Sequence, residues 1–97
     1  MSKTKAARPH DEWLRAQLKN RKFAAEYLNA AAEDEDVRVY VAALRNVAEA
    51  QGMAKVAEAA GMPRESLYRA LSLKGNPRLS TLAAILKAAK LKLTVVT

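Results

Sequence analysis

Four polar residues near the middle of the chain have side chains of the kind that read DNA bases: Arg64, Glu65, Ser66 and Arg69. An arginine can donate to the O6 and N7 atoms of guanine, and a glutamate can accept from the N4 atom of cytosine. On a helix, the first three would fill one turn and Arg69 the next, on the side turned away from the core. This spacing predicts contact with base edges in a DNA major groove.

A second group of residues around these four is suited to the DNA backbone. Basic and hydroxyl side chains, amides of asparagine and the free backbone amides that open a helix all bind phosphate without reading sequence. Met53 would contribute its backbone amide, and the side chain of Tyr68 would lie partly in the core and partly against phosphate. We expect this role for Met53, Lys55, Tyr68, Lys74, Asn76, Arg78 and Ser80.

Two short helices within residues 53–72 would position these side chains. Gly61 permits the left-handed backbone that ends a helix. Pro63 suits the start of the next helix, where its missing amide proton would have no partner. The core-facing positions are Val56, Ala57, Ala60, Leu67 and Leu71. The pattern is that of a helix-turn-helix.

From about Phe23 onward the chain resembles the HigA-like family of addiction-module antidote proteins, antitoxins of the lambda-repressor-like (XRE/Cro-CI type) helix-turn-helix class. The most specific likeness is Leu67-Tyr68-Arg69 followed by Gly75-Asn76-Pro77. Pro63 departs from the family, which usually has Ser or Thr there, and a proline has no side-chain oxygen to cap the helix. Further matching stretches are 23–28, 43–44, 53–54, 56–57, 61, 66–72 and 80–82.

The resemblance implies an antitoxin that neutralises a RelE/ParE-like toxin and represses its own operon by binding double-stranded operator DNA. A homodimer is expected, because one helix-turn-helix reads too few base pairs to be selective. Two alternatives remain open: a stand-alone helix-turn-helix repressor without a toxin partner, and a protein-interaction module whose helix-turn-helix is degenerate.

Composition excludes several other functions. The 97-residue chain has no cysteine, which excludes a thiolate nucleophile, and we expect its one histidine, His10, to be a surface residue that belongs to neither a triad nor a zinc cluster. It also lacks a glycine-rich phosphate loop. We therefore expect no catalytic residues, no metal and no cofactor. No apolar run approaches the length of a signal or membrane segment, which predicts a cytoplasmic protein without membrane contact.

The fold class and the basic surface also follow from composition. A chain that is 51% hydrophobic and rich in alanine favours closely packed helices, so we expect an all-α, small helical bundle. The net charge of +7 is uneven: residues 61–97 carry seven basic side chains and one acidic, whereas residues 1–36 carry seven of each. A solvated basic surface would explain this excess, but beside a helix-turn-helix it indicates a phosphate-facing side.

The N-terminal third divides into an arm and a helical extension. Residues 1–10 lack apolar periodicity and are expected to be a flexible basic arm. Residues 11–36 predict two short amphipathic helices, the first capped by Asp11 and the second with an apolar face that begins at Phe23.

This extension is the candidate toxin-binding region, because a helix-turn-helix core does not need it. Its aromatic residues are possible anchors, and its acidic run fits a basic partner. The alternatives are that the aromatic residues belong to the core and that the acidic run solvates a loop and favours the next helix through its dipole. The candidates are Trp13, Phe23, Tyr27, Glu33, Asp34, Glu35 and Asp36.

The remaining two thirds hold the expected DNA-binding domain and a tail. Residues 37–90 predict a long helix from Val37 to Gln51, the helix-turn-helix, and a last helix capped by Ser80 or a neighbour. Residues 91–97 alternate and then become β-branched, which predicts a short strand. Such a strand would pair with its copy at a dimer interface, with frayed coil as the alternative.

Overall fold

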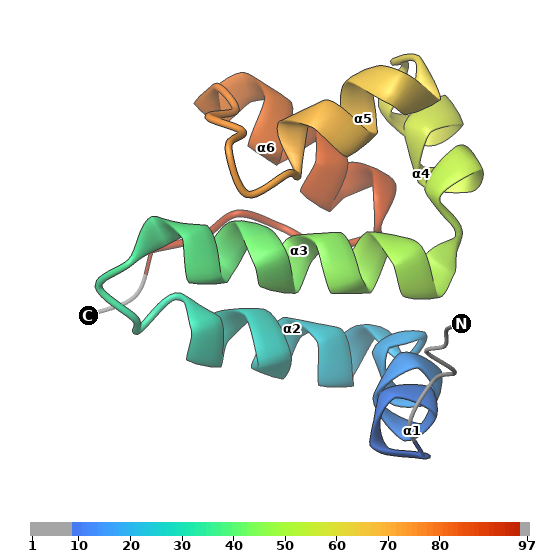
Figure 1. The fold of residues 1–97 in the computed structure, drawn as a ribbon, viewed down its shortest axis with the longest axis vertical. Coiled ribbons are helices and arrows are strands. Elements are labelled where there is room, and N and C mark those ends of the chain that lie inside the picture. The colour runs from blue at the N-terminus through green and yellow to red at the C-terminus, as the bar shows by residue number, and fades with distance from the viewer. Residues whose placement is uncertain (1–8, 96–97) are drawn as a thin grey trace, which may run out of the picture.

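The longest helix, α3 (Val37–Gln51), lies at the centre of the fold in the computed structural model, which describes residues 9–95 (Figure 1). On one side of it lie α1 (Pro9–Leu18) and α2 (Arg21–Ala31). On the other side lie α4 (Met53–Ala60), α5 (Arg64–Ala70) and α6 (Leu79–Ala88). The all-α prediction is confirmed, and residues 9–95 contain no β-strand.

The first two helices begin slightly earlier than predicted. Helix α1 starts at Pro9 rather than after a cap at Asp11, because proline fits the first turn of a helix, where no amide proton is needed. The Asn20 side chain accepts a hydrogen bond of 3.0 Å from the Phe23 amide and so starts α2 at Arg21. The predicted arm therefore loses residues 9 and 10 to α1, and its residues 1–8 lie outside the described part.

A single buried cluster joins both sides of α3. Leu18 of α1 and Leu28 of α2 are 1% and 3% exposed. They belong to the same cluster as Leu44 of α3 and Leu67 of α5. The N-terminal helices therefore cover apolar side chains of the central helix rather than standing apart from it. The other fully buried large side chains are Val47, Val56, Leu71, Ile85 and Leu86.

The predicted pair of helices joined at Gly61 is confirmed. Gly61 has φ 72° and ψ 35°, a left-handed conformation, and the Met62 amide donates 3.0 Å to the Ala57 carbonyl. These two features satisfy the last carbonyls of α4 and turn the chain. Pro63 precedes the first helical residue of α5 and supplies no side-chain cap.

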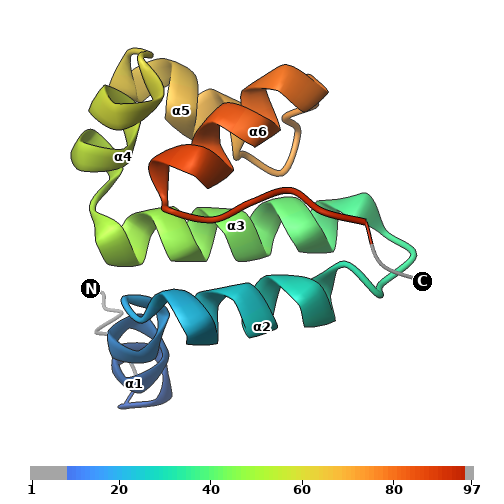
Figure 2. The same cartoon turned by 180° about the vertical axis from the view of Figure 1, so that it is seen from behind.

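The segment after α6 differs from the prediction. Lys90 adopts φ 67°, and the Leu91 amide donates 2.8 Å to the Leu86 carbonyl, which ends the helix. Residues 91–95 then run in an extended path across α3 (Figure 2) but form no strand. A strand needs a neighbour to complete its hydrogen bonds, and none of the described residues provides one. Residues 96–97 lie outside the described part.

Candidate nucleic-acid interface

The predicted base-reading residues of α5 do not all lie on one face of the helix. Leu67 and Leu71 are buried, so the opposite side of the helix carries the exposed Glu65 and Arg69. With 3.6 residues per turn, Arg64 lies on one flank of this side and Ser66 on the other. The four residues are therefore split between an outward centre and two flanks.

An open groove of about 580 Å³ follows the flank that carries Ser66. It brings Ser66 and Arg69 together with Lys74, Asn76 and Arg78 from the loop between α5 and α6. The Arg69 guanidinium lies 3.5 Å from the Ser66 hydroxyl oxygen. Two predicted base-reading residues and three predicted phosphate-binding residues thus share one concave surface.

Gly75 fixes the distance between this loop and α5. A Cβ atom at Gly75 would lie 2.6 Å from the Ala70 carbonyl oxygen and 2.7 Å from that of Arg69, closer than atoms can approach. The Gly75 amide also donates 2.9 Å to the Ser72 carbonyl. The absence of a side chain therefore lets the basic loop lie directly against the end of α5.

Helices α4, α5 and α6 all begin without a side-chain cap. No side chain caps α4, which starts at Met53 with its own side chain buried, or α6. The first amides of each have no partner within the helix and can bind an anion. The expectation that Ser80 or a neighbour caps α6 is wrong: Arg78 occupies the cap position without a side-chain bond, and Ser80 lies in the first turn. Helix α6 begins at Leu79, two residues too early for Ser80 to occupy the cap position.

Lys55 lies apart from the first groove. It lines a second groove of about 520 Å³ together with Lys19, Arg21 and Lys90. The sequence did not indicate this basic cluster, because its members come from three separate parts of the chain. Lys55 remains a candidate phosphate contact, with neighbours from the N-terminal helices.

Tyr68 lies close to two arginines, one of which was missed. The Cζ atoms of Arg45 and Arg64 are 5.7 Å and 5.6 Å from the centroid of the Tyr68 ring, within cation–π range. Arg45 belongs to α3, which the sequence suggested only as a wall of the core. No local pattern in the sequence indicated that Arg45 would lie beside Tyr68.

The three aromatic toxin candidates have different surroundings. Trp13 is 52% exposed, and its ring meets Phe23 edge to face with centroids 5.9 Å apart. His10, exposed as expected, stacks on Trp13 at 6.1 Å. Tyr27 instead accepts a 2.9 Å hydrogen bond from the Asn46 side chain of α3. Trp13 is thus an exposed residue, whereas Phe23 and Tyr27 are partly buried against the core.

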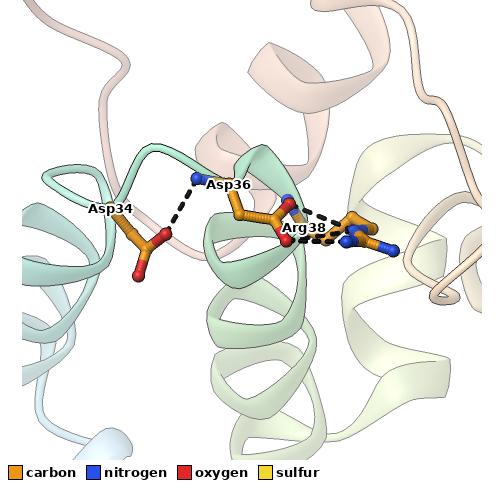
Figure 3. A network of polar contacts seen from close by, with 3 residues as sticks. All are labelled: Asp34, Asp36 and Arg38. Atoms are coloured by element: carbon orange, nitrogen blue, oxygen red, sulfur yellow. Dashed lines mark hydrogen bonds and ion pairs between the residues drawn. The ribbon is translucent and has the colours of Figure 1, made fainter.

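The acidic run forms the turn between α2 and α3 (Figure 3). The Asp34 carboxylate accepts 2.8 Å from the Asp36 amide, and the Asp36 carboxylate accepts 2.9 Å from the Arg38 amide as the cap of α3. Asp36 also pairs with the Arg38 guanidinium at 2.8 Å. The hydrogen bonds from Arg38 lower the pKa of Asp36 and raise that of Arg38. Glu33 and Glu35 are exposed.

Neither a metal centre nor a membrane span is found in residues 9–95. Within that range no three histidine, cysteine or acidic side chains gather closely enough to hold a metal ion. None of its helices has both the length and the apolar character needed to cross a membrane.

Comparison with known proteins gives one family and one relative. Residues 13–97 match the model of a family described as "Probable addiction module antidote protein". A protein of Haemophilus influenzae Rd, described as uncharacterized, is 38% identical to this chain over 69 residues, which is 71% of each protein. No solved structure matches the chain significantly.

Proposed function

The chain belongs to the family of probable addiction module antidote proteins, and from this premise we propose that it is the antitoxin of a type II toxin–antitoxin module. In this proposal it binds and neutralises a RelE/ParE-like toxin and represses its own operon in the cytoplasm. The family is one of antidotes rather than enzymes, and the proposal needs neither cofactor nor metal. The family match, which extends over residues 13–97, is the observation that carries it.

Operator binding rests on the chemistry around α5, which would act as the recognition helix of a lambda-repressor-like helix-turn-helix. Arg64, Glu65, Ser66 and Arg69 would read bases, and the other predicted contacts would hold phosphates. The groove that joins Ser66 and Arg69 to Lys74, Asn76 and Arg78 supports this arrangement. The excess of basic side chains in residues 61–97 supports it too.

A homodimer would place two such helices on an inverted repeat, with half-site centres about 10 base pairs apart. The tail supplies a candidate contact, since Leu93 and Val95 are 45% and 96% exposed on an extended backbone. Pairing of two tails about a two-fold axis would satisfy the backbone of both and cover these side chains.

The toxin-neutralising role is tested by growth. The neighbouring gene is expressed alone and together with this chain, and we expect arrest in the first case and rescue in the second. Rescue with direct binding of the two purified proteins supports the antitoxin. If the neighbouring product is harmless and does not bind, the stand-alone repressor becomes the better reading.

The DNA-binding role is tested with the segment upstream of the gene and a random duplex of equal length. We expect Arg69→Ala to cost about 1–3 kcal/mol of discrimination at one base position. We expect Lys74→Ala to weaken both duplexes alike and to lower the salt slope by about one unit. If the wild type prefers neither duplex and neither substitution matters, the degenerate protein-interaction module is favoured.

A further inference from the structure

Two arginines from different helices meet at one aromatic ring beside the recognition helix. Arg45 comes from the middle of α3 and Arg64 from the first turn of α5, and both guanidiniums lie within 6 Å of the centroid of Tyr68, at 5.7 Å and 5.6 Å. The Arg64 Nη2 atom also lies 3.4 Å from the Tyr68 hydroxyl oxygen. One ring at the junction of α3 and α5 is therefore within cation–π range of two guanidiniums.

The charges at this junction do not balance. Glu49, one turn after Arg45, accepts a hydrogen bond of 3.2 Å from its Nε atom. No carboxylate among residues 9–95 forms an ion pair with Arg64. Two guanidiniums with one carboxylate leave a net positive charge, and their remaining donors can bind an anion with oxygens in a planar or tetrahedral arrangement. A phosphate group has this chemistry.

The position of the pair matches the geometry of a major groove. Ser66 and Ala70 lie on one flank of α5, along the groove that contains the basic loop. Arg64 and Tyr68 are one turn apart and lie on the opposite flank. A helix inserted in a major groove about 12 Å wide has a phosphate backbone on each side. The basic loop can bind one of these two phosphate backbones. Cations that bind the other phosphate backbone would have to lie on the flank of Arg64 and Tyr68.

We propose that Arg45 and Arg64, held by the Tyr68 ring, form a second phosphate-binding site that contacts the DNA strand across the groove from the 74–78 loop. This inference rests on the proposed DNA binding and deepens it. It assigns a DNA contact to α3 and moves Arg64 from base reading to the backbone. Tyr68 becomes a positioning residue, whose ring keeps both guanidiniums oriented.

Glu49 has a defined part in this site. In the free protein it pairs with Arg45 while both side chains remain partly exposed, at 33% and 39%. When a phosphate binds, the carboxylate is a nearby like charge and a competitor for the same donor. Removing its charge should therefore strengthen binding, which is the opposite of the effect expected for the arginines.

The test measures binding to a fluorescent random-sequence duplex, with the upstream segment as a second probe, by anisotropy across a salt series, because phosphate contacts do not depend on sequence. Arg45→Gln and Arg64→Gln should each weaken binding by about tenfold or more and lower the salt slope by about 0.9. Glu49→Gln should strengthen binding. Arg15→Gln, an exposed position on α1 beyond α3, is the matched control and should change neither quantity.

Two further variants separate charge from stacking. Tyr68→Phe keeps the ring and should retain more affinity than Tyr68→Leu, which should lower affinity at an unchanged salt slope, since both charges remain. Circular dichroism melts of each variant establish that it is folded. Glu49→Gln keeps the test decisive if Arg45→Gln unfolds the protein, because its predicted gain cannot come from a loss of structure.

The possible outcomes distinguish a failure of the second phosphate site from a failure of the proposed DNA binding. If the wild type shows no salt-dependent binding to any duplex, the proposed DNA binding fails. If the wild type binds and Lys74→Ala weakens binding, but folded Arg45→Gln and Glu49→Gln behave as the wild type does, the second phosphate site is overturned alone. If only Arg64→Gln matters, and only on the upstream segment, Arg64 reads a base.

Discussion

At the scale of single residues, Asp36 combines two roles at the start of α3. Its carboxylate accepts a hydrogen bond from the Arg38 amide, which caps the helix, and at the same time pairs with the Arg38 guanidinium. The hydrogen bonds from Arg38 lower the pKa of Asp36, so the folded protein favours the charged carboxylate. A carboxyl with a lowered pKa stabilises the fold above its unfolded pKa and loses this effect as pH falls through the folded value.

The lowered pKa of Asp36 predicts how the stability of the protein depends on pH. The wild type should lose more stability than Asp36→Asn as pH falls from about 6 to about 2, because asparagine can still accept the capping bond but has no proton to gain. The two unfolding curves should approach each other at the acidic end. Urea unfolding at several pH values measures the difference. A difference independent of pH would mean that the ion pair with Arg38 does not act in solution.

The sequence identified which residues have DNA-binding chemistry better than it identified their partners. Ser66, Arg69, Lys74, Asn76 and Arg78 were predicted, and the structure gathers them at one groove. Their grouping followed from local spacing along one helix and the loop after it. Arg45 could not be found in this way, because its neighbour Tyr68 is brought to it only by the packing of α5 on the rest of the fold.

At the scale of elements, the helix ends were predicted where the residue type decides the backbone. Gly61 ends α4 in a left-handed conformation, as its type suggested. Asn20 and Asp36 start α2 and α3 with their side chains, and neither of these caps was predicted. Helix α6 ends with the same conformation at Lys90, which no residue preference indicates. No strand forms in residues 91–95 of the single chain, because strand formation depends on a partner that local sequence cannot specify.

Substitutions at Gly61 and Lys90 should therefore change the stability of the protein in opposite directions. Gly61→Ala should destabilise the protein by about 1 kcal/mol, because its Cβ would meet open space and only the backbone is strained. Lys90→Gly should stabilise it by about 1 kcal/mol, since glycine adopts positive φ without that strain. Chemical denaturation measures both. Lys90→Gln is the control for the lost charge, and it should keep the wild-type stability.

An increase in stability for Lys90→Gln equal to that of Lys90→Gly would contradict the backbone explanation. It would mean that relief of charge repulsion is the cause, because Lys90 shares a groove with Lys19, Arg21 and Lys55. Unfolding at high salt separates the two causes, since screening removes a charge effect and leaves a backbone effect.

At the scale of the whole molecule, the N-terminal helices and the α4–α6 unit are built on the same central helix. Leu18 is 1% exposed and belongs to the core that also contains Leu67. Removing α1 would therefore open that core, and any loss of toxin binding in a truncated chain would also reflect lost folding. Single exposed residues are the better probes of the proposed toxin surface.

Trp13 is the best such probe, because it is 52% exposed and its ring meets that of Phe23. It belongs to α1, which lies on the opposite side of α3 from α5 (Figure 1). Partly exposed tryptophans supported by a second aromatic ring are typical interface anchors. We expect Trp13→Ser to lose about 2 kcal/mol or more of affinity for the neighbouring toxin and to fail in growth rescue. Its DNA binding should stay unchanged, since no predicted DNA contact lies on α1.

Leu79→Ser on α6 is the matched control, because Leu79 is 68% exposed but lies on the α4–α6 side of α3. It should leave toxin affinity and rescue unchanged. A double substitution of Glu33 and Glu35 to glutamine tests the acidic turn at the far end of α2, where both side chains are exposed. If Trp13→Ser binds and neutralises the toxin as the wild type does while the glutamine variant fails, the toxin surface lies at the α2–α3 turn, and Trp13 serves only to cover Phe23.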